Sequence, residues 1–280
     1  MQDEKNAIIC VMIPLIIAIV AAVGGFAALH YAADWGLTWS IVSGLGVFFA
    51  IQITVGLRFR RVLAAITAQV QQIMVEGQRR VQQKMQRWQL RPPGSVKAAQ
   101  REIFDDMRIS VDAALKVSEQ LRRYRLWVPL LERQIATMQL QLVWMVRDFD
   151  RADKLLPKAI MADPMLSAIK LARMQMLNAP IEKISEVYKR SVRRLRYNQN
   201  TLPAACYSWI LVHRQDLDGA FKVLTEALKN SDDETLRKNH TALMNNRPLQ
   251  FSNSGLGDKW YSLFLEEPKV RMQHQRAVYR

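Results

Sequence analysis

The sequence predicts an all-α protein in which a transmembrane helical hairpin precedes a long linker helix and a stack of helix pairs. Three observations favour this class. Residues 8–29 and 37–57 are apolar runs without a charged side chain. Apolar positions elsewhere recur at the helical period, and no stretch shows the sustained alternation typical of strands, so we expect essentially no sheet. A pattern of Asp and Ala at positions 148–159 also recurs at positions 216–227.

Each apolar run is long enough, at about 1.5 Å per residue, to cross a hydrocarbon layer of roughly 30 Å. Tyr31 and Trp35 in the connector, with Trp39 beyond it, are aromatic residues typical of the membrane interface. No ionisable group lies mid-membrane, which disfavours a channel or transporter. Small residues four apart would let the two spans pack closely: Ala18 and Ala22, Ala21 and Gly25, and Ser40 and Gly44.

The second span is followed directly by Arg58, Arg60 and Arg61, whereas the connector carries only Asp34. By the positive-inside rule the basic end stays in the cytoplasm, so we expect both termini to be cytoplasmic. These arginines are the candidate lipid-facing residues. We expect an integral protein of a bacterial inner (plasma) membrane. A cleaved signal peptide is the alternative for residues 8–29, but the acidic start and the length of the run disfavour it.

The basic charge belongs wholly to the part after the spans. The chain carries +15 in total, and residues 1–57 carry −2, so the remainder carries +17. Anionic lipid headgroups, nucleic acid and an acidic protein are three candidate partners for this charge. The adjoining membrane favours lipid, and nucleic acid is disfavoured because no nucleic-acid-binding motif accompanies the charge. Cys10 and Cys206 lie too far apart to pair, which fits reduced thiols.

Residues 58–94 form the second segment, a juxtamembrane amphipathic helix over residues 59–91 that ends at a Pro/Gly break. Either this helix packs on the helices that follow, which we favour, or it self-associates into a homo-oligomeric stalk. The main domain boundary is expected at Pro92, Pro93 and Gly94. Ser95 is the predicted N-cap of a helix that reaches about Trp127. The apolar stripe of residues 59–91 consists of Val62, Ile66, Val70, Ile73, Gly77, Val81, Met85 and Trp88.

The most specific pattern lies in residues 133–234. Four pairs of identical residues share one separation, which is twice a period of about 34 residues. The pairs are Asp148 and Asp216, Asp150 and Asp218, Ala152 and Ala220, and Ala159 and Ala227. Acidic residues in a short turn, followed by small residues where two helices meet, indicate a repeated helical hairpin.

At these positions the chain resembles the tetratricopeptide repeat (TPR) family. The resemblance implies an α-solenoid of about three helix pairs within a helical domain 95–244, with repeats at 133–166, 167–200 and 201–234. The middle repeat is degenerate, with helices expected at 167–177 and 184–195, and Pro157 should kink a second helix. The matching signature residues are Ala136, Val143, Ala152, Leu156, Ala159, Pro164, Ala204, Leu211, Ala220, Leu224 and Ala227.

Members of this family bind protein segments in a concave groove lined by their first helices. Trp144 and Trp209 would engage an apolar or helical segment, although burial in the core is an equally good interpretation. The carboxylate clamp of chaperone-binding members is absent. Carried over by position, the protein-binding groove would present Gln134, Thr137, Gln141, Trp144, Met145, Gln175, Asn178, Ala205, Trp209 and His213.

Residues 245–280 form an irregular aromatic and basic tail, and we expect residues 260–265 to dock on the last repeat as a cap. The sequence offers no catalytic constellation, metal-ligand spacing or phosphate-binding loop, so we expect neither an enzyme nor a cofactor. The leading hypothesis is a membrane-tethered adaptor or scaffold that recruits proteins at the cytoplasmic face. A self-oligomerising structural protein is one alternative. A two-helix anchor before repeats is also similar to the HemY-like membrane proteins, which would imply an auxiliary role in porphyrin metabolism.

Overall fold

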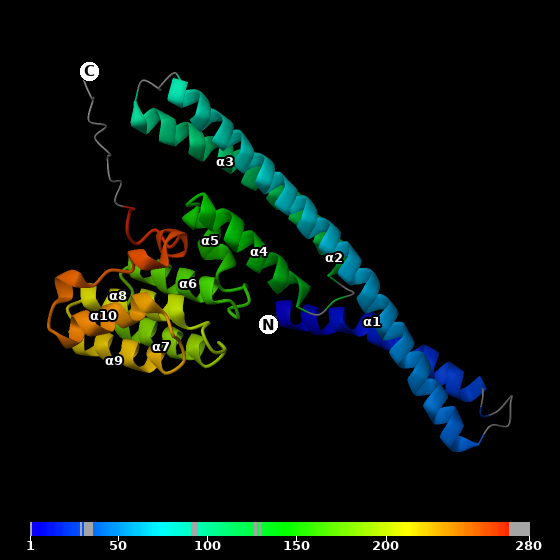
Figure 1. Ribbon diagram of the computed structural model, residues 1–280. Coiled ribbons are helices and arrows are strands. Elements are labelled where there is room, and N and C mark those ends of the chain that lie inside the picture. Colours follow the sequence, from blue (N-terminus) through cyan, green and yellow to red (C-terminus); the bar gives the residue numbers. More distant parts are fainter. Residues whose placement is uncertain are drawn as a thin grey trace. The chain divides into compact units, whose positions relative to one another are not determined.

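Helices account for all the regular structure in the part of the chain that the computed structural model describes, which confirms the all-α class. The described residues are 2–28, 30, 36–90, 95–125, 128 and 130–268. The connector aromatics Tyr31 and Trp35, the break at 92–94, Trp127 and the basic end 269–280 lie outside them. The chain divides into two compact units, Met1–Ile160 and Met161–Arg280 (Figure 1). The boundary expected at residues 92–94 therefore lies inside the first unit.

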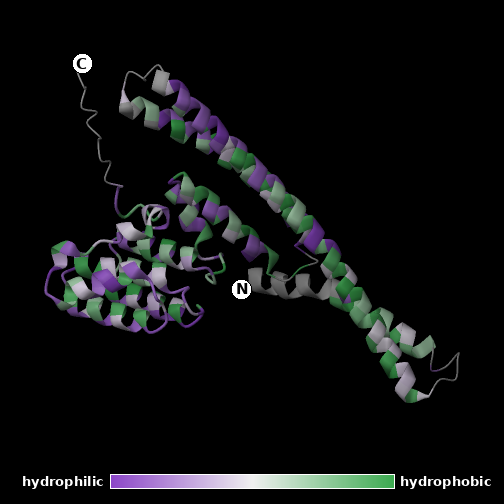
Figure 2. Cartoon of the chain, viewed as in Figure 1, coloured by the Kyte–Doolittle hydropathy of each residue, from purple (hydrophilic) through white to green (hydrophobic). Residues whose placement is uncertain are grey.

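The first unit begins with α1 (Gln2–Ala27) and α2 (Leu37–Leu90), which pack against each other. Among the described residues one helix, Leu37–Trp88, is long and apolar enough to cross a membrane; the apolar stretch Leu15–Ala27 of α1 is shorter. Figure 2 shows apolar residues concentrated in the half of α2 beside α1 and hydrophilic residues along the other half. One continuous helix of 54 residues thus joins an apolar segment to a basic one.

Small side chains let α1 and α2 approach closely. Ala18 and Ser40 are fully buried. A methyl group added at Gly44 would lie 3.1 Å from the backbone oxygen of Ala22, which is closer than an ordinary van der Waals contact. The two backbones are therefore nearly in contact at Gly44, as small residues at a helix interface allow.

The other half of α2 is covered by α3 (Val96–Glu119), the 3₁₀ helix η2 (Gln120–Tyr124) and α4 (Leu131–Met145). Ile66 and Val70 are buried in the clusters that these helices share. A Cβ on Gly77 would lie 2.4 Å from Ser110 Oγ, so a larger residue would require α2 or α3 to shift. The stripe of residues 59–91 thus packs on the following helices over most of its length. Ser95 caps α3 as predicted, accepting from the Ala98 N–H at 3.5 Å.

The first unit ends with α5 (Phe149–Leu155), and here the expected kink at Pro157 is wrong. The helix stops before the proline instead of bending through it. Leu156 is its C-cap residue, and Ala159 lies beyond its end. A proline cannot donate the backbone hydrogen bond of a helix. For a helix as short as α5, termination before the proline therefore costs less free energy than a kink through it.

The second unit stacks two helix pairs and a further helix. These are α6 (Pro164–Met176) with α7 (Ile181–Val192), α8 (Thr201–His213) with α9 (Leu217–Leu228), and α10 (Glu234–Met244). Helix α8 packs on α6, α7 and α9, and α10 packs on α9. The first helix of the middle pair starts at Pro164 instead of residue 167, because Asp163 caps it and proline suits a first helical turn. Its partner α7 likewise starts at Ile181 instead of residue 184.

Four helices, α4, α6, α8 and α10, end in the same kind of turn. In each, a residue with positive φ follows the helix, and the next N–H returns to a carbonyl of the last helical turn, which is the Schellman arrangement. The positive-φ residues are Arg147, Asn178, Gln215 and Asn246, and the returning hydrogen bonds measure 3.1, 2.9, 2.9 and 2.8 Å in that order.

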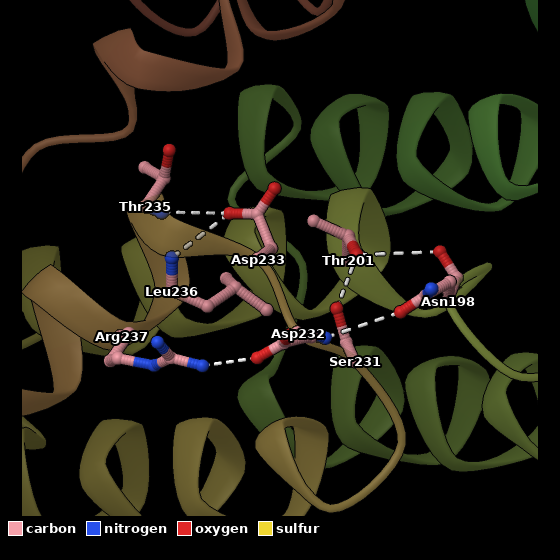
Figure 3. Close-up of polar contacts among 8 residues, drawn as sticks. All are labelled: Asn198, Thr201, Ser231, Asp232, Asp233, Thr235, Leu236 and Arg237. Atoms are coloured by element: carbon pink, nitrogen blue, oxygen red, sulfur yellow. Dashed lines mark hydrogen bonds and ion pairs between the residues drawn. The ribbon is translucent and has the colours of Figure 1, made fainter.

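Two loops of the second unit, the one between α7 and α8 and the one between α9 and α10, are also joined to each other (Figure 3). The Asp232 N–H donates to Asn198 Oδ1 at 3.2 Å. The hydroxyl groups of Thr201 and Ser231 lie 2.7 Å apart. Asp233 caps α10 by accepting from the N–H groups of Thr235 and Leu236, and Arg237 pairs with Asp232. The loop before α8 is therefore fixed against the loop before α10.

Candidate functional site

In the second unit, the face of α8 expected to bind a partner is covered by the chain's own C-terminal segment. This segment, residues 251–266, includes the 3₁₀ helix η4 (Ser254–Leu256) and the short helix α11 (Asp258–Tyr261), and it follows η3 (Pro248–Gln250). Helix α11 packs on α8, and Trp260 and Leu263 are fully buried. The aromatic residues 260–265 therefore dock on α8, within the segment 201–234 where a last repeat was expected, but they do not cap the end of the stacked helices. The tail covers the α8 face, and α10 is the element that follows α9.

One carboxylate joins two tryptophans at this interface. Glu266 accepts from the indole N–H of Trp209 at 2.7 Å with one oxygen and from that of Trp260 at 2.8 Å with the other. The two rings meet edge to face with centroids 5.9 Å apart, and His213 stacks on Trp209 at 3.6 Å. Hydrogen bonds to a charged acceptor are about twice as strong as neutral ones, so this contact holds the end of segment 251–266 on α8.

A second polar contact lies in the interior. Asn253 is fully buried and donates to the Ala205 carbonyl of α8 at 2.9 Å. Its side-chain oxygen accepts from Asn239 of α10 at 2.7 Å, and Asn239 in turn accepts from the Ser252 N–H at 2.9 Å. Because the two buried amides satisfy each other and the backbone, they fix the tail in one register on α8 and α10.

No sequence pattern signals this network. Asn253 stands in a Ser- and Gly-rich stretch that resembles an ordinary turn, and Glu266 is one of two adjacent glutamates. Neither residue belongs to a periodic pattern. The aromatic residues of 260–265 indicate that this segment docks, but they do not indicate which helix face receives it.

The ten predicted groove residues divide equally between the two units. In the second unit, Ala205 is fully buried and Trp209 is 7% exposed beneath the tail, while His213 and Asn178 are exposed. Gln175 is half-buried and accepts two hydrogen bonds from the Arg214 guanidinium, at 3.1 and 2.7 Å.

In the first unit, Trp144 is 1% exposed and meets Phe149 edge to face at 5.2 Å, so it belongs to the contact between α4 and α5. The Thr137 hydroxyl donates to the Arg133 carbonyl at 2.7 Å and accepts from the Ile160 N–H at 2.8 Å. Gln134, Gln141 and Met145 are exposed. Both tryptophans thus serve the core, as large aromatic residues on helices usually do.

The repeat-signature positions are mostly interior. Leu156 and Ala159 are half-buried, and Pro164 is the first residue of α6. The others pack between helices, where a small or branched apolar side chain fits; they are Ala136, Val143, Ala152, Ala204, Leu211, Ala220, Leu224 and Ala227.

Two titratable groups, Cys206 of α8 and Tyr188 of α7, are buried. Burial raises the pKa of the Cys206 thiol far above its ordinary value, so the thiolate needed for nucleophilic chemistry does not form at neutral pH. Burial also raises the pKa of Tyr188 to about 12; a hydrogen bond with Asn200 opposes this shift. Within the described ranges, no three His, Cys, Asp or Glu side chains gather as metal ligands would.

Arg58, Arg60 and Arg61 are exposed on α2 where its apolar half ends.

Comparisons of the chain with family models, with curated proteins and with solved structures found no match.

Proposed function

We propose that this protein is a membrane-anchored adaptor or scaffold of the tetratricopeptide type that organises partner proteins at the cytoplasmic face of a bacterial inner membrane. The observation that carries the proposal is the continuity of α2. Its apolar half has the composition of a membrane span, and its basic half is built into the core formed with α3 and α4. A helical domain is thereby held directly against a bilayer surface.

The anchor in this proposal is a hairpin of α1 and α2. The close approach of Gly44 to Ala22 supports it, since small residues drive helix association in lipid, where apolar side chains alone give no preference. The exposed Arg58, Arg60 and Arg61 support a cytoplasmic location for the basic side, by the positive-inside rule.

The helical-repeat assignment rests on the shared turns and on the stacked pairs of the second unit. The α8 face is the proposed client site, and the tail indicates which chemistry it accepts. Trp260 inserts an indole, and Glu266, in the same short segment, supplies a carboxylate to two indole N–H groups. A client segment with a large aromatic residue and a carboxylate at that spacing would compete with the tail for α8.

The test compares affinity purification from native membranes for the full-length protein and two variants. Glu266→Ala removes the carboxylate that holds the tail, and Glu267→Ala is the matched control because Glu267 is exposed. We expect Glu266→Ala to recover more of a specific partner than either the control or the wild type. Equal recovery from all three proteins would exclude the α8 face as the client site.

Topology is tested separately by adding protease to intact cells and to inverted membrane vesicles. We expect residues 58–268 to be cut only in the inverted vesicles. Cleavage in intact cells would overturn the cytoplasmic assignment without bearing on the client site.

The alternative proposal is self-association through residues 59–91. The apolar stripe of these residues leaves less exposed surface for a second copy than the sequence indicates. Ile66, Val70 and Gly77 are buried by α3 and α4. Only the end of the stripe remains open, where Met85 is 52% exposed. Mass photometry in detergent separates the two proposals, because an adaptor of this design needs no second copy.

A further inference from the structure

Two segments that are far apart in the sequence meet where the apolar half of α2 ends. Helix α3 runs antiparallel to α2. Lys84 of α2 pairs with Glu102 at 2.8 Å, and further along Gly77 faces Ser110. At the end of this contact, the rings of Phe59 and Tyr124 lie 6.4 Å apart. The 3₁₀ helix η2 is therefore beside residues 58–62, at the level where the apolar half stops.

This placement gathers arginines from both segments. Arg58, Arg60 and Arg61 are exposed on α2. Arg122, Arg123 and Arg125 are exposed in and just after η2. Glu119 pairs with Arg122 at 2.8 Å. Residues 58–63 and 119–133 together hold seven arginines against two glutamates, so a strong positive excess remains beside the apolar segment.

Apolar side chains are exposed at the same level. Leu57 is 51% exposed on α2, and Leu130 is 60% exposed immediately before α4. Leu130 also has a φ of 63°, a left-handed conformation that is unfavourable for leucine. Its neighbour Leu131 packs into the cluster around Ile66 and Leu121, which fixes the turn at the membrane-proximal end of α4. Exposed leucines among arginines are typical of a surface that lies in the headgroup region of a bilayer.

We propose that Arg58, Arg60 and Arg61 of α2, Arg122, Arg123 and Arg125 of the η2 segment, and Leu130 form one surface that binds the headgroups of anionic phospholipids. It is a membrane contact of the helical domain in addition to the span, and it rests on the proposed anchoring by α2. Arginine forks pair with phosphate through two hydrogen bonds, and a lipid surface attracts basic residues within a Debye length.

The role of this surface is to orient the domain. A span alone lets a domain rotate and tilt about its anchor. A second contact, on the η2 segment far along the chain from Arg58, fixes which side of α2 faces the bilayer. Helices α4 and α5, which complete the first unit, then project from the membrane in one direction.

The test uses the full-length protein in detergent micelles, titrated with fluorescent phosphatidylglycerol or phosphatidylcholine. The test variant is Arg123→Gln/Arg125→Gln. The matched control is Arg79→Gln/Arg80→Gln, which removes two exposed arginines from α2 about 30 Å further from the apolar half. We expect phosphatidylglycerol binding to weaken about 25-fold in the test variant, roughly fivefold per arginine, and less than about twofold in the control.

Three outcomes would overturn the inference: equal losses in both variants, no loss in the test variant, or binding of phosphatidylcholine as tight as that of phosphatidylglycerol. Carbonate extraction of native membranes gives a separate readout for the span. Release of the wild-type protein by carbonate would reject the anchoring proposal itself. Retention of both variants together with an unchanged lipid affinity would reject only the arginine surface.

Discussion

Asp148 and Asp216 occupy the same position in two turns of the chain. Asp148 accepts from the Arg151 N–H at 3.1 Å, and Asp216 accepts from the Gly219 N–H at 2.8 Å. Both follow a residue with positive φ, and both cap the second helix of a pair. The two turns thus share one local structure, although Asp148 lies in the first unit and Asp216 in the second.

Each capping aspartate should contribute to stability by a similar amount. We expect Asp148→Ala and Asp216→Ala each to cost about 0.5–2 kcal/mol in denaturant unfolding, because an N-cap residue satisfies a helix N–H that is otherwise unpaired. Asp216→Asn should retain most of the stability, since Asn caps as well as Asp. A loss in Asp216→Asn as large as that in Asp216→Ala would assign the effect to charge instead of capping.

The docked tail should stabilise the second unit through buried apolar area. Leu263→Ala is expected to cost about 2–5 kcal/mol, because it empties a fully buried site. Leu249→Ala makes the same chemical change at a fully exposed site and should stay within about 0.5 kcal/mol. Thermal unfolding of the two variants beside the wild type measures both. Equal midpoints would show that the tail is not docked on α8.

Gly77 should resist substitution although alanine favours helices. A Cβ there would lie 2.4 Å from Ser110 Oγ and 2.8 Å from Ser110 Cβ, so α2 and α3 must separate. We expect Gly77→Ala to destabilise by about 1–3 kcal/mol, against a helix-propensity gain of up to about 1 kcal/mol. Gly56→Ala is the control, since no atom beyond its chain neighbours and the backbone of its own helical turns lies within 4 Å of its added Cβ. A Gly77→Ala protein more stable than the wild type would contradict the close contact.

Alkaline pH should destabilise the second unit through Tyr188. Burial raises the pKa of this phenol to about 12 from an ordinary value of 10.0, so the unfolded chain loses its proton first as pH rises. The stabilisation is therefore complete below pH 10 and lost progressively towards pH 12. The stability of the wild type relative to Tyr188→Phe should fall by up to ~3 kcal/mol across that window.

Tyr197→Phe is the matched control for this titration, because Tyr197 is largely exposed. Unfolding midpoints of the three proteins from neutral pH up to about pH 12 measure the effect. A stability difference between the wild type and Tyr188→Phe that does not change with pH would contradict the burial of the phenol.

The features that the sequence predicts correctly are those fixed by local chemistry. Ser95 caps α3 because its hydroxyl needs only a backbone N–H three residues ahead. The apolar stripe of α2 is recognisable because a helix repeats about every 3.6 residues whatever covers it. The Asp148 and Asp216 turns follow from short-range spacing.

The features that it does not predict depend on contacts between distant segments. Helix periodicity places Trp209 on one face of α8, but it does not identify the segment that covers this face. That segment is held by Asn253 and Glu266, which lie much further along the chain. Helix α8 is buried on nearly every side, so its composition does not distinguish a binding face from a core face. The ring contact between Phe59 and Tyr124 likewise forms because α3 packs antiparallel to α2, and no local sequence pattern predicts that packing.

The unbroken course of α2 has a mechanical consequence. Its 54 residues form a rod of about 80 Å, with no proline or other hinge between Leu37 and Leu90. In the proposed anchoring, a tilt of the apolar half by about 10° as bilayer thickness changes would move the far end of the rod, about 50 Å beyond residue 57, through about 9 Å. Lateral strain in the lipid would therefore reach the opposite tip of the first unit as a displacement comparable to the diameter of a helix.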